Sequence, residues 1–272
     1  MAITGTGTQA DPYVVTTWDE LVSKAAESGK YVKLGADIDM NDEYPEGLNS
    51  AITINCKEID GDGKSIKNIK TEANCLISTS NINGICKNLN FTNMLIGGGS
   101  NSTSFIYQSD YHGVYKFNRC KFSGRFEGNS SNKSNIVYGY TRFDYCSFNL
   151  QMASNSRILA EYSSSHHIFL YYCNLNLTGD TAETLYMILK NSYVKGSLSN
   201  ATVCAEAQNN SERGLYSVLD VTAPAYTADS RTQLVLANSD KCSSIGQYLT
   251  PVTSAQLTNA EYLSSIGFPI ET

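Results

Sequence analysis

The chain has 272 residues and a formal net charge of −6; 17% of its residues are charged, 41% are hydrophobic and 18 are tyrosines. Its length suffices for one large or two small domains, and a charged fraction below the roughly 25% of ordinary soluble proteins argues against a coiled coil or an ordinary helical enzyme. The negative charge argues against nucleic acid as a partner, and the lack of an apolar run of about 18 residues argues against a membrane-spanning helix.

The first predicted element is a short helix near the N-terminus. Thr17 and Glu20 have the spacing of a capping box, and apolar residues follow at helical spacing over 18–28. Gly29 is a suitable residue to end this helix. We therefore expect residues 1–29 to form an N-terminal arm and a capping helix.

The middle of the chain consists of short alternating runs of strand length, separated by Gly, Asn and Ser. One pattern recurs around Cys120, Cys146 and Cys173, which lie 26 and 27 residues apart. An apolar residue stands three positions before each cysteine and another two positions after it. Looser copies occur at 85–91 and 189–194. A repeat with one short strand per match and no intervening helix predicts a β-solenoid.

Stacked coils would place equivalent side chains one above another at about 4.8 Å. We therefore expect Cys120, Cys146 and Cys173 to form a ladder in the core. A thiol suits such a position because it is small, apolar and needs no hydrogen-bond partner. Side chains that stack point the same way, which disfavours disulfide geometry. Together with the absence of a secretory leader, this favours free thiols for the eight cysteines over a disulfide framework.

Residues 54–69 (INCKEIDGDGKSIKNI) look like an early coil of the right-handed parallel β-helix proteins of the pectate-lyase-like superfamily. Residues 88–93 (NLNFTN) resemble their repeating coil, and residues 5–13 and 256–269 are similar to the ends of bacteriophage and bacterial-surface β-helix proteins. The resemblance implies an all-β, single-stranded right-handed parallel β-helix. We expect it over 30–220, with an irregular C-terminal cap or interface segment over 221–272.

The resemblance also implies a function. It points to a structural protein of the bacteriophage virion surface, either a capsid decoration or a head or tail appendage, assembled in the host cytoplasm. The expected partners are other virion proteins, further copies of the chain in a homo-oligomer (a trimer by analogy), and a glycan of the host surface. No cofactor is expected. Two alternatives stay open: a glycan-degrading enzyme of the tailspike or polysaccharide-lyase kind, and a bacterial cell-surface adhesin.

The enzyme alternative depends on carboxylates. Glycoside hydrolysis requires two of them about 5–10 Å apart. Residues 97–200 hold only six acidic residues, and Asp144 with Glu161, on neighbouring repeat units, is the best pair. No metal site is expected, because His166 and His167 are adjacent and would point to opposite faces of a strand. The chain is therefore predicted to be non-enzymatic.

The prediction that the chain binds a ligand or a partner rests on its tyrosines. Residues 97–200 hold eleven of the 18, and a tyrosine offers a large rigid surface with a polar hydroxyl. The alternative is that these rings only cover the outside of the coils. The candidate binding residues are Tyr138, Tyr140, Tyr162, Tyr171 and Tyr172.

Overall fold

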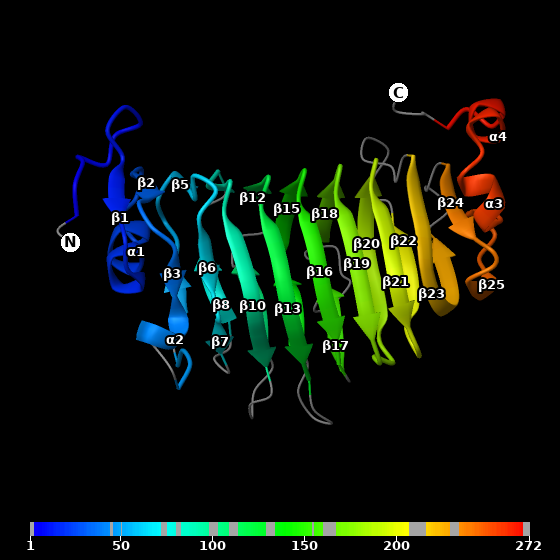
Figure 1. Cartoon of the computed structure of the whole chain (residues 1–272), viewed down its shortest axis with the longest axis horizontal. Coiled ribbons are helices and arrows are strands. Elements are labelled where there is room, and N and C mark those ends of the chain that lie inside the picture. Colours follow the sequence, from blue (N-terminus) through cyan, green and yellow to red (C-terminus); the bar gives the residue numbers. More distant parts are fainter. Residues whose placement is uncertain are drawn as a thin grey trace.

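The computed structural model describes residues 3–43, 46–49, 51–71, 75–79, 83–97, 103–108, 114–128, 134–153, 155–159, 167–206, 216–228 and 234–268. Short strands stack coil upon coil along one long axis, with the N-terminal helix at one end and the C-terminal helices at the other (Figure 1). The named strands pair in parallel throughout the stack. The fold is therefore the all-β parallel β-helix that the sequence predicts.

Three sheets share the coils. Sheet A holds β1 (Tyr13–Val15), β2 (Tyr31–Leu34), β5 (Glu58–Asp60), β9 (Ile85–Lys87), β12 (Tyr115–Asn118), β15 (Tyr140–Asp144), β18 (His167–Tyr171), β20 (Thr184–Lys190), β22 (Thr202–Glu206) and β25 (Cys242–Ile245). Sheet B holds β3 (Ile38–Asp39), β6 (Ser65–Lys67), β7 (Lys70–Thr71), β10 (Asn90–Gly97), β13 (Lys121–Glu127), β16 (Ser147–Met152), β19 (Asn174–Gly179), β21 (Tyr193–Leu198), β24 (Val235–Asn238) and β26 (Thr250–Val252). The long strand β23 (Ser217–Ala228) belongs to sheet B in its first half and to sheet A in its second. Sheet C holds β4 (Ile52–Thr53), β8 (Cys75–Thr79), β11 (Thr103–Gln108), β14 (Ser134–Tyr138) and β17 (Ser156–Leu159).

Helix α1 (Trp18–Ala25) begins where the capping pattern predicts, because the Thr17 side chain accepts a hydrogen bond from the Glu20 N–H. Its buried residues Trp18, Leu21 and Ala25 cover the first coil. The other helices are α2 (Met40–Glu43), α3 (Ser254–Leu257) and α4 (Ala260–Ser265). None of the helices in the described ranges has the length and apolar character needed to cross a membrane.

The parallel ladder continues past residue 220 as far as Val252, the last residue of β26. The C-terminal helices then fold against the outside of sheet B, where Tyr262, Leu263 and Phe268 pack on Val218 and Leu236. Coils therefore extend into the segment for which only an irregular cap was expected. The division into 1–29, 30–220 and 221–272 as domains stays a prediction.

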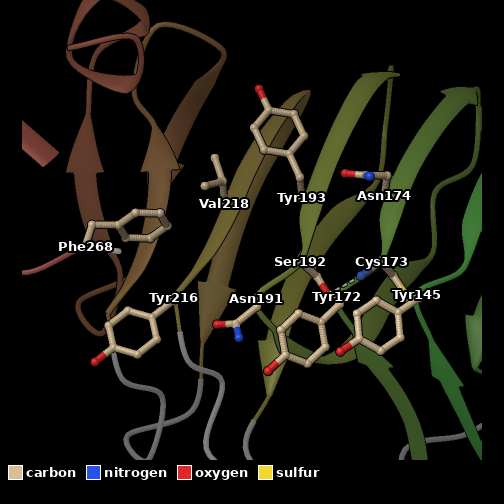
Figure 2. Close-up of a pocket in the computed structure, with 10 residues that line it drawn as sticks. All are labelled: Tyr145, Tyr172, Cys173, Asn174, Asn191, Ser192, Tyr193, Tyr216, Val218 and Phe268. Atoms are coloured by element: carbon tan, nitrogen blue, oxygen red, sulfur yellow. Dashed lines mark hydrogen bonds between the residues drawn. The ribbon is translucent and has the colours of Figure 1, made fainter. Parts of the chain in front are cut away.

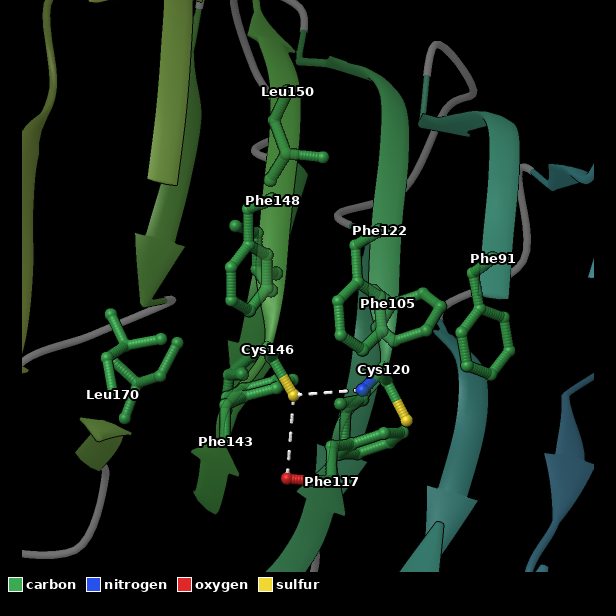
Figure 3. Packing of buried hydrophobic residues seen from close by; sticks show 14 of the residues in the cluster. Phe91, Phe105, Phe117, Cys120, Phe122, Phe143, Cys146, Phe148, Leu150 and Leu170 are labelled. Carbon is green, nitrogen blue, oxygen red and sulfur yellow. Dashed lines mark hydrogen bonds between the residues drawn. The ribbon is translucent and has the colours of Figure 1, made fainter. Parts of the chain in front are cut away.

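The core follows the sequence repeat. Phe117 pairs in register with Phe143 and Phe143 with Leu170, while Phe122 pairs with Phe148. The aromatic rings stack along the axis: the centroids of Phe117 and Phe143 lie 5.1 Å apart, and those of Phe122 and Phe148 lie 4.9 Å apart (Figure 3). The repeat aligned in the sequence is therefore the structural coil.

Cys120, Cys146 and Cys173 are buried at the turn from sheet A into sheet B, and Figure 3 shows the first two of them. The N–H of Cys120 donates to Sγ of Cys146 at 3.4 Å, and the N–H of Cys173 donates to Oγ of Ser192, the equivalent residue of the next coil, at 3.0 Å. The Cys173 thiol itself donates to the carbonyl oxygen of Phe143 at 3.3 Å. These positions also serve the turn, because the turn leaves a backbone N–H that the next coil's side chain satisfies.

The buried thiols of Cys56 and Cys75 are expected to lower the free energy of unfolding at alkaline pH. Burial raises the pKa of Cys56 to about 12 and that of Cys75 to about 11. In the unfolded chain these thiols titrate near pH 8.5. The stability that comes from keeping them protonated in the folded chain is therefore fully present below that pH and is lost as the pH rises toward 11–12. We expect the free energy of unfolding, from urea titrations, to fall by about 1 kcal/mol per thiol between pH 8 and pH 9.5. Cys75→Ser should lessen the fall, and equal stabilities at the two pH values would contradict the prediction.

Candidate functional site

The turn from sheet A into sheet B places one residue of each coil in the left-handed backbone region. Four successive coils place Tyr145, Tyr172, Asn191 and Tyr216 there, with φ between 48° and 57°. The strands that follow are in register, since Asn174 pairs with Tyr193 and Tyr193 with Val218. The four side chains therefore form one row along the axis on the outside of the molecule (Figure 2).

Two tyrosines of this row stack on each other. The ring centroids of Tyr145 and Tyr172 lie 4.8 Å apart, and their planes differ by 9°. Tyr145 is 55% exposed, Tyr172 38% and Tyr216 37%. Asn191 interrupts the aromatic row between Tyr172 and Tyr216 (Figure 2). Tyr145 and Tyr172 each lie in a two-residue turn between consecutive strands, and Tyr216 directly precedes β23.

A groove of ≈ 420 Å³ runs along the row. Phe268, just after the C-terminal helices, stands beside Tyr216 with ring centroids 6.2 Å apart and planes at 85° (Figure 2). The lining residues come from four coils and the C-terminal segment: Tyr145, Tyr172, Cys173, Asn174, Asn191, Ser192, Tyr193, Tyr216, Val218 and Phe268. Aromatic rings and neutral polar groups thus share one concave surface.

Among the described residues, Asp220 is the only acidic residue that hydrogen-bonds to a lining side chain, and its carboxylate is bound by several other groups. The Tyr193 hydroxyl donates to Asp220 at 2.5 Å, and Asn238 and Lys241 bind the other carboxylate oxygen at 2.6 and 2.9 Å. Burial opposes ionisation, but the hydrogen bonds from Tyr193, Lys241 and Asn238 lower the pKa of Asp220. Burial, followed by the bond to Asp220, raises the pKa of Tyr193. Tyr193 therefore offers its ring to the groove and no proton at neutral pH.

The lining carries little chemical reactivity. Among the described residues it contains no carboxylate, imidazole or amine. The Cys173 thiol and the Ser192 hydroxyl are buried and donate to backbone carbonyl oxygens, that of Ser192 to Leu170 at 2.7 Å. With no base beside either of them, nucleophilic catalysis lacks its usual arrangement. The groove is suited to binding a neutral ligand.

The structure places the predicted tyrosines in different surroundings. Tyr172 lies in the groove. Tyr138 stacks on Tyr107 on sheet C, with centroids 5.1 Å apart, and Tyr140 packs beside Phe169 on sheet A. Tyr162 lies outside the described residues.

The prediction that Tyr171 binds a ligand is wrong, because its side chain is only 5% exposed and cannot present its ring to a ligand. It packs with Phe169 and Ile188 in a small cluster separate from the main core. The guanidinium of Arg142 lies 4.4 Å from its ring centroid. Strand alternation does send it to the opposite side from the core, but the neighbouring coils cover it there.

The predicted carboxylate pair is not brought together in the described structure. Glu161 lies outside the described residues. Asp144 is nearly buried, and Nε of Arg142 donates to its two oxygens at 2.7 and 3.0 Å. Asp144 does not line the groove.

Sequence reasoning missed Tyr145, Tyr216 and Phe268. A signal for the first two was present, because each stands directly before the inward-facing residue of the repeat, as Tyr172 does. Phe268 had no such signal, since it follows the last coil.

No protein-family model matches the chain, and no curated protein sequence is similar to it. Among solved structures, it is similar to a crystal structure of a "putative immunoglobulin A1 protease" from Bacteroides ovatus. The TM-score is 0.50 and the identity 16%, over 96% of this chain and 89% of that chain. At this identity the likeness concerns the fold, and it supports the parallel β-helix. Membership of the pectate-lyase-like superfamily and a place among phage proteins stay predictions.

Proposed function

We propose that this chain is a non-enzymatic β-helical surface protein whose tyrosine groove binds a glycan. The row of exposed tyrosines over a neutral groove carries the proposal. Flat aromatic faces bind the C–H surface of a sugar at little cost in conformational entropy, while amides and hydroxyls at their edges bond sugar hydroxyls. Rings fixed to hydrogen-bonded strands need no reordering on binding.

The setting that fits the sequence resemblance is the bacteriophage virion, where the chain would be a capsid decoration or a head or tail appendage. Other virion proteins and further copies of the chain, in a trimer, would be its neighbours. Co-sedimentation with assembled capsids or tails and the mass in analytical ultracentrifugation test these two points. A bacterial adhesin would bind glycan through the same groove but would not sediment with virions.

The enzyme alternative gains no support from the groove. Asp144 is paired with Arg142 away from it, and the described lining residues hold no acid or base. The name of the Bacteroides ovatus protein bears on that protein alone. Release of reducing or unsaturated sugars from a bound glycan would overturn the non-enzymatic proposal.

Glycan binding is tested with Tyr172→Ala against Tyr107→Ala. The two tyrosines are equally exposed at 38%, and each stacks on another tyrosine, but only Tyr172 lines the groove. On a glycan array followed by calorimetry, Tyr172→Ala should weaken binding roughly tenfold, the effect of losing about 1.4 kcal/mol of contact. Tyr107→Ala should bind as the unaltered chain does. Equal losses in both variants, or no glycan bound at all, would contradict the proposal.

A further inference from the structure

We propose that the gap between Tyr172 and Tyr216, above Asn191, is a slot for one pyranose ring whose substituents are all equatorial. This inference rests on the proposed glycan binding and names the sugar. Tyr172, Asn191 and Tyr216 hold the same turn position in three successive coils. At about 4.8 Å per coil, Tyr172 and Tyr216 stand about 10 Å apart along the axis.

The width of the slot follows from the stack beside it. Tyr145 and Tyr172 show that one ring fills one coil step, with centroids 4.8 Å apart. A ring above Asn191 would lie one step from Tyr172 and one step from Tyr216, in contact with both. Phe268 stands beside Tyr216 with its ring nearly perpendicular and lines the same end of the groove (Figure 2). The missing aromatic side chain at Asn191 thus leaves room for a ligand ring of the same thickness.

Two aromatic walls select the configuration of the sugar. A chair with only equatorial substituents, as in glucose and xylose joined by β linkages, presents axial C–H groups on both faces. An axial hydroxyl, as at C4 of galactose or C2 of mannose, would point at one ring and lose its water without a partner. We therefore expect gluco- and xylo-configured residues to bind, and galacto- and manno-configured residues to bind much more weakly.

The edges of the slot are polar and neutral. Asn191 lies at its base and contributes a neutral amide to the lining; its Oδ1 is buried, with no hydrogen-bond partner among the described residues. Asn174 and the hydroxyls of the row's tyrosines lie around the same groove (Figure 2). This ring of neutral donors and acceptors matches sugar hydroxyls better than the bare edge of an aromatic ligand. The lack of cationic side chains among the described lining residues favours a neutral sugar over a uronic acid.

The decisive variant is Asn191→Tyr. Tyrosine already occupies this backbone conformation at residues 145, 172 and 216, so it should continue the stack without disturbing the coil. It would fill the slot with a ring, whereas Asn191→Ala would leave the slot open. Tyr216→Ala would remove one wall and provides a second test should Asn191→Tyr misfold.

The experiment is calorimetry of the full chain and its variants with β-linked gluco-, xylo-, galacto- and manno-oligosaccharides and, for comparison, a nucleoside and an aromatic peptide. We expect gluco- and xylo-oligosaccharides to bind and the others to bind at least roughly tenfold more weakly. Asn191→Tyr should abolish binding, Tyr216→Ala should weaken it roughly tenfold, and Asn191→Ala should weaken it severalfold.

The outcomes separate the two proposals. If galacto- or manno-oligosaccharides bind as well as gluco-oligosaccharides, or if Asn191→Tyr binds normally, the slot is wrong while glycan binding stands. Binding of the nucleoside or the aromatic peptide in place of sugars overturns the slot and the glycan proposal together. So does a failure to bind any saccharide.

Discussion

Replacing Phe122 with alanine is expected to lower the free energy of unfolding by about 3–5 kcal/mol. Its ring is buried at the centre of an aromatic core that spans several coils (Figure 3). It stacks on Phe91 and Phe148, with centroids 5.4 and 4.9 Å away, and meets three further rings edge to face, those of Phe105, Phe117 and Phe143. The strands that carry these rings are hydrogen-bonded on both sides, so they cannot close the cavity that alanine would leave.

Urea titration monitored by circular dichroism measures this loss of free energy of unfolding, and two further variants serve as comparisons. Phe122→Leu keeps most of the volume and should cost less than about 1.5 kcal/mol. Tyr107→Ala removes a ring from an exposed stack and should cost less than about 1 kcal/mol. A loss below about 1 kcal/mol for Phe122→Ala would contradict the prediction, because it would mean that the coils relax around the cavity.

The register of the coils could be predicted from the sequence because each coil carries the same short pattern. Phe117 and Phe143 align in the sequence and pair in the structure, and so do Leu170 and Leu189 in the looser copy. In a stacked parallel solenoid, equal positions in the repeat become neighbours in space, so an alignment of repeats is also a contact map. The inward or outward direction of most side chains followed from the same alignment.

The C-terminal coils escaped prediction because their period changes. The looser copy at 189–194 is still recognisable, but Ser217 and Val235, which pair in the next two coils, are only 18 residues apart, and the side chain at that position changes from a hydroxyl to an apolar group. Sheet C ends at β17, so the described later coils alternate between sheets A and B. A search for a period near 27 residues therefore loses the pattern in the two-strand coils that follow residue 217.

The candidate site was only partly predictable. The alternation of side chains along a strand determines the face on which each side chain lies, but it does not determine what covers that face. Tyr171 and Tyr172 do point differently, yet Tyr171 is buried under Arg142 and the side chains of neighbouring coils. The aromatic row could be found by asking which residue precedes the inward position of each repeat. Phe268 could not, since it reaches the groove through the packing of the C-terminal helices.

Gly196→Ala should destabilise the chain by about 3–5 kcal/mol, and Gly63→Ala by only about 1–2 kcal/mol. Both glycines have positive φ, +123° and +79°, so both substitutions strain the backbone. A Cβ at Gly63 would meet nothing within 4 Å, whereas at Gly196 it would lie 1.9 Å from the carbonyl oxygen of Leu177 in the preceding coil. That carbonyl belongs to the parallel ladder of β19 and β21, so it can move only if strand pairing is lost. Urea titrations of both variants measure the difference; equal losses would show that backbone strain, and not the close approach of successive coils, is what requires glycine in sheet B.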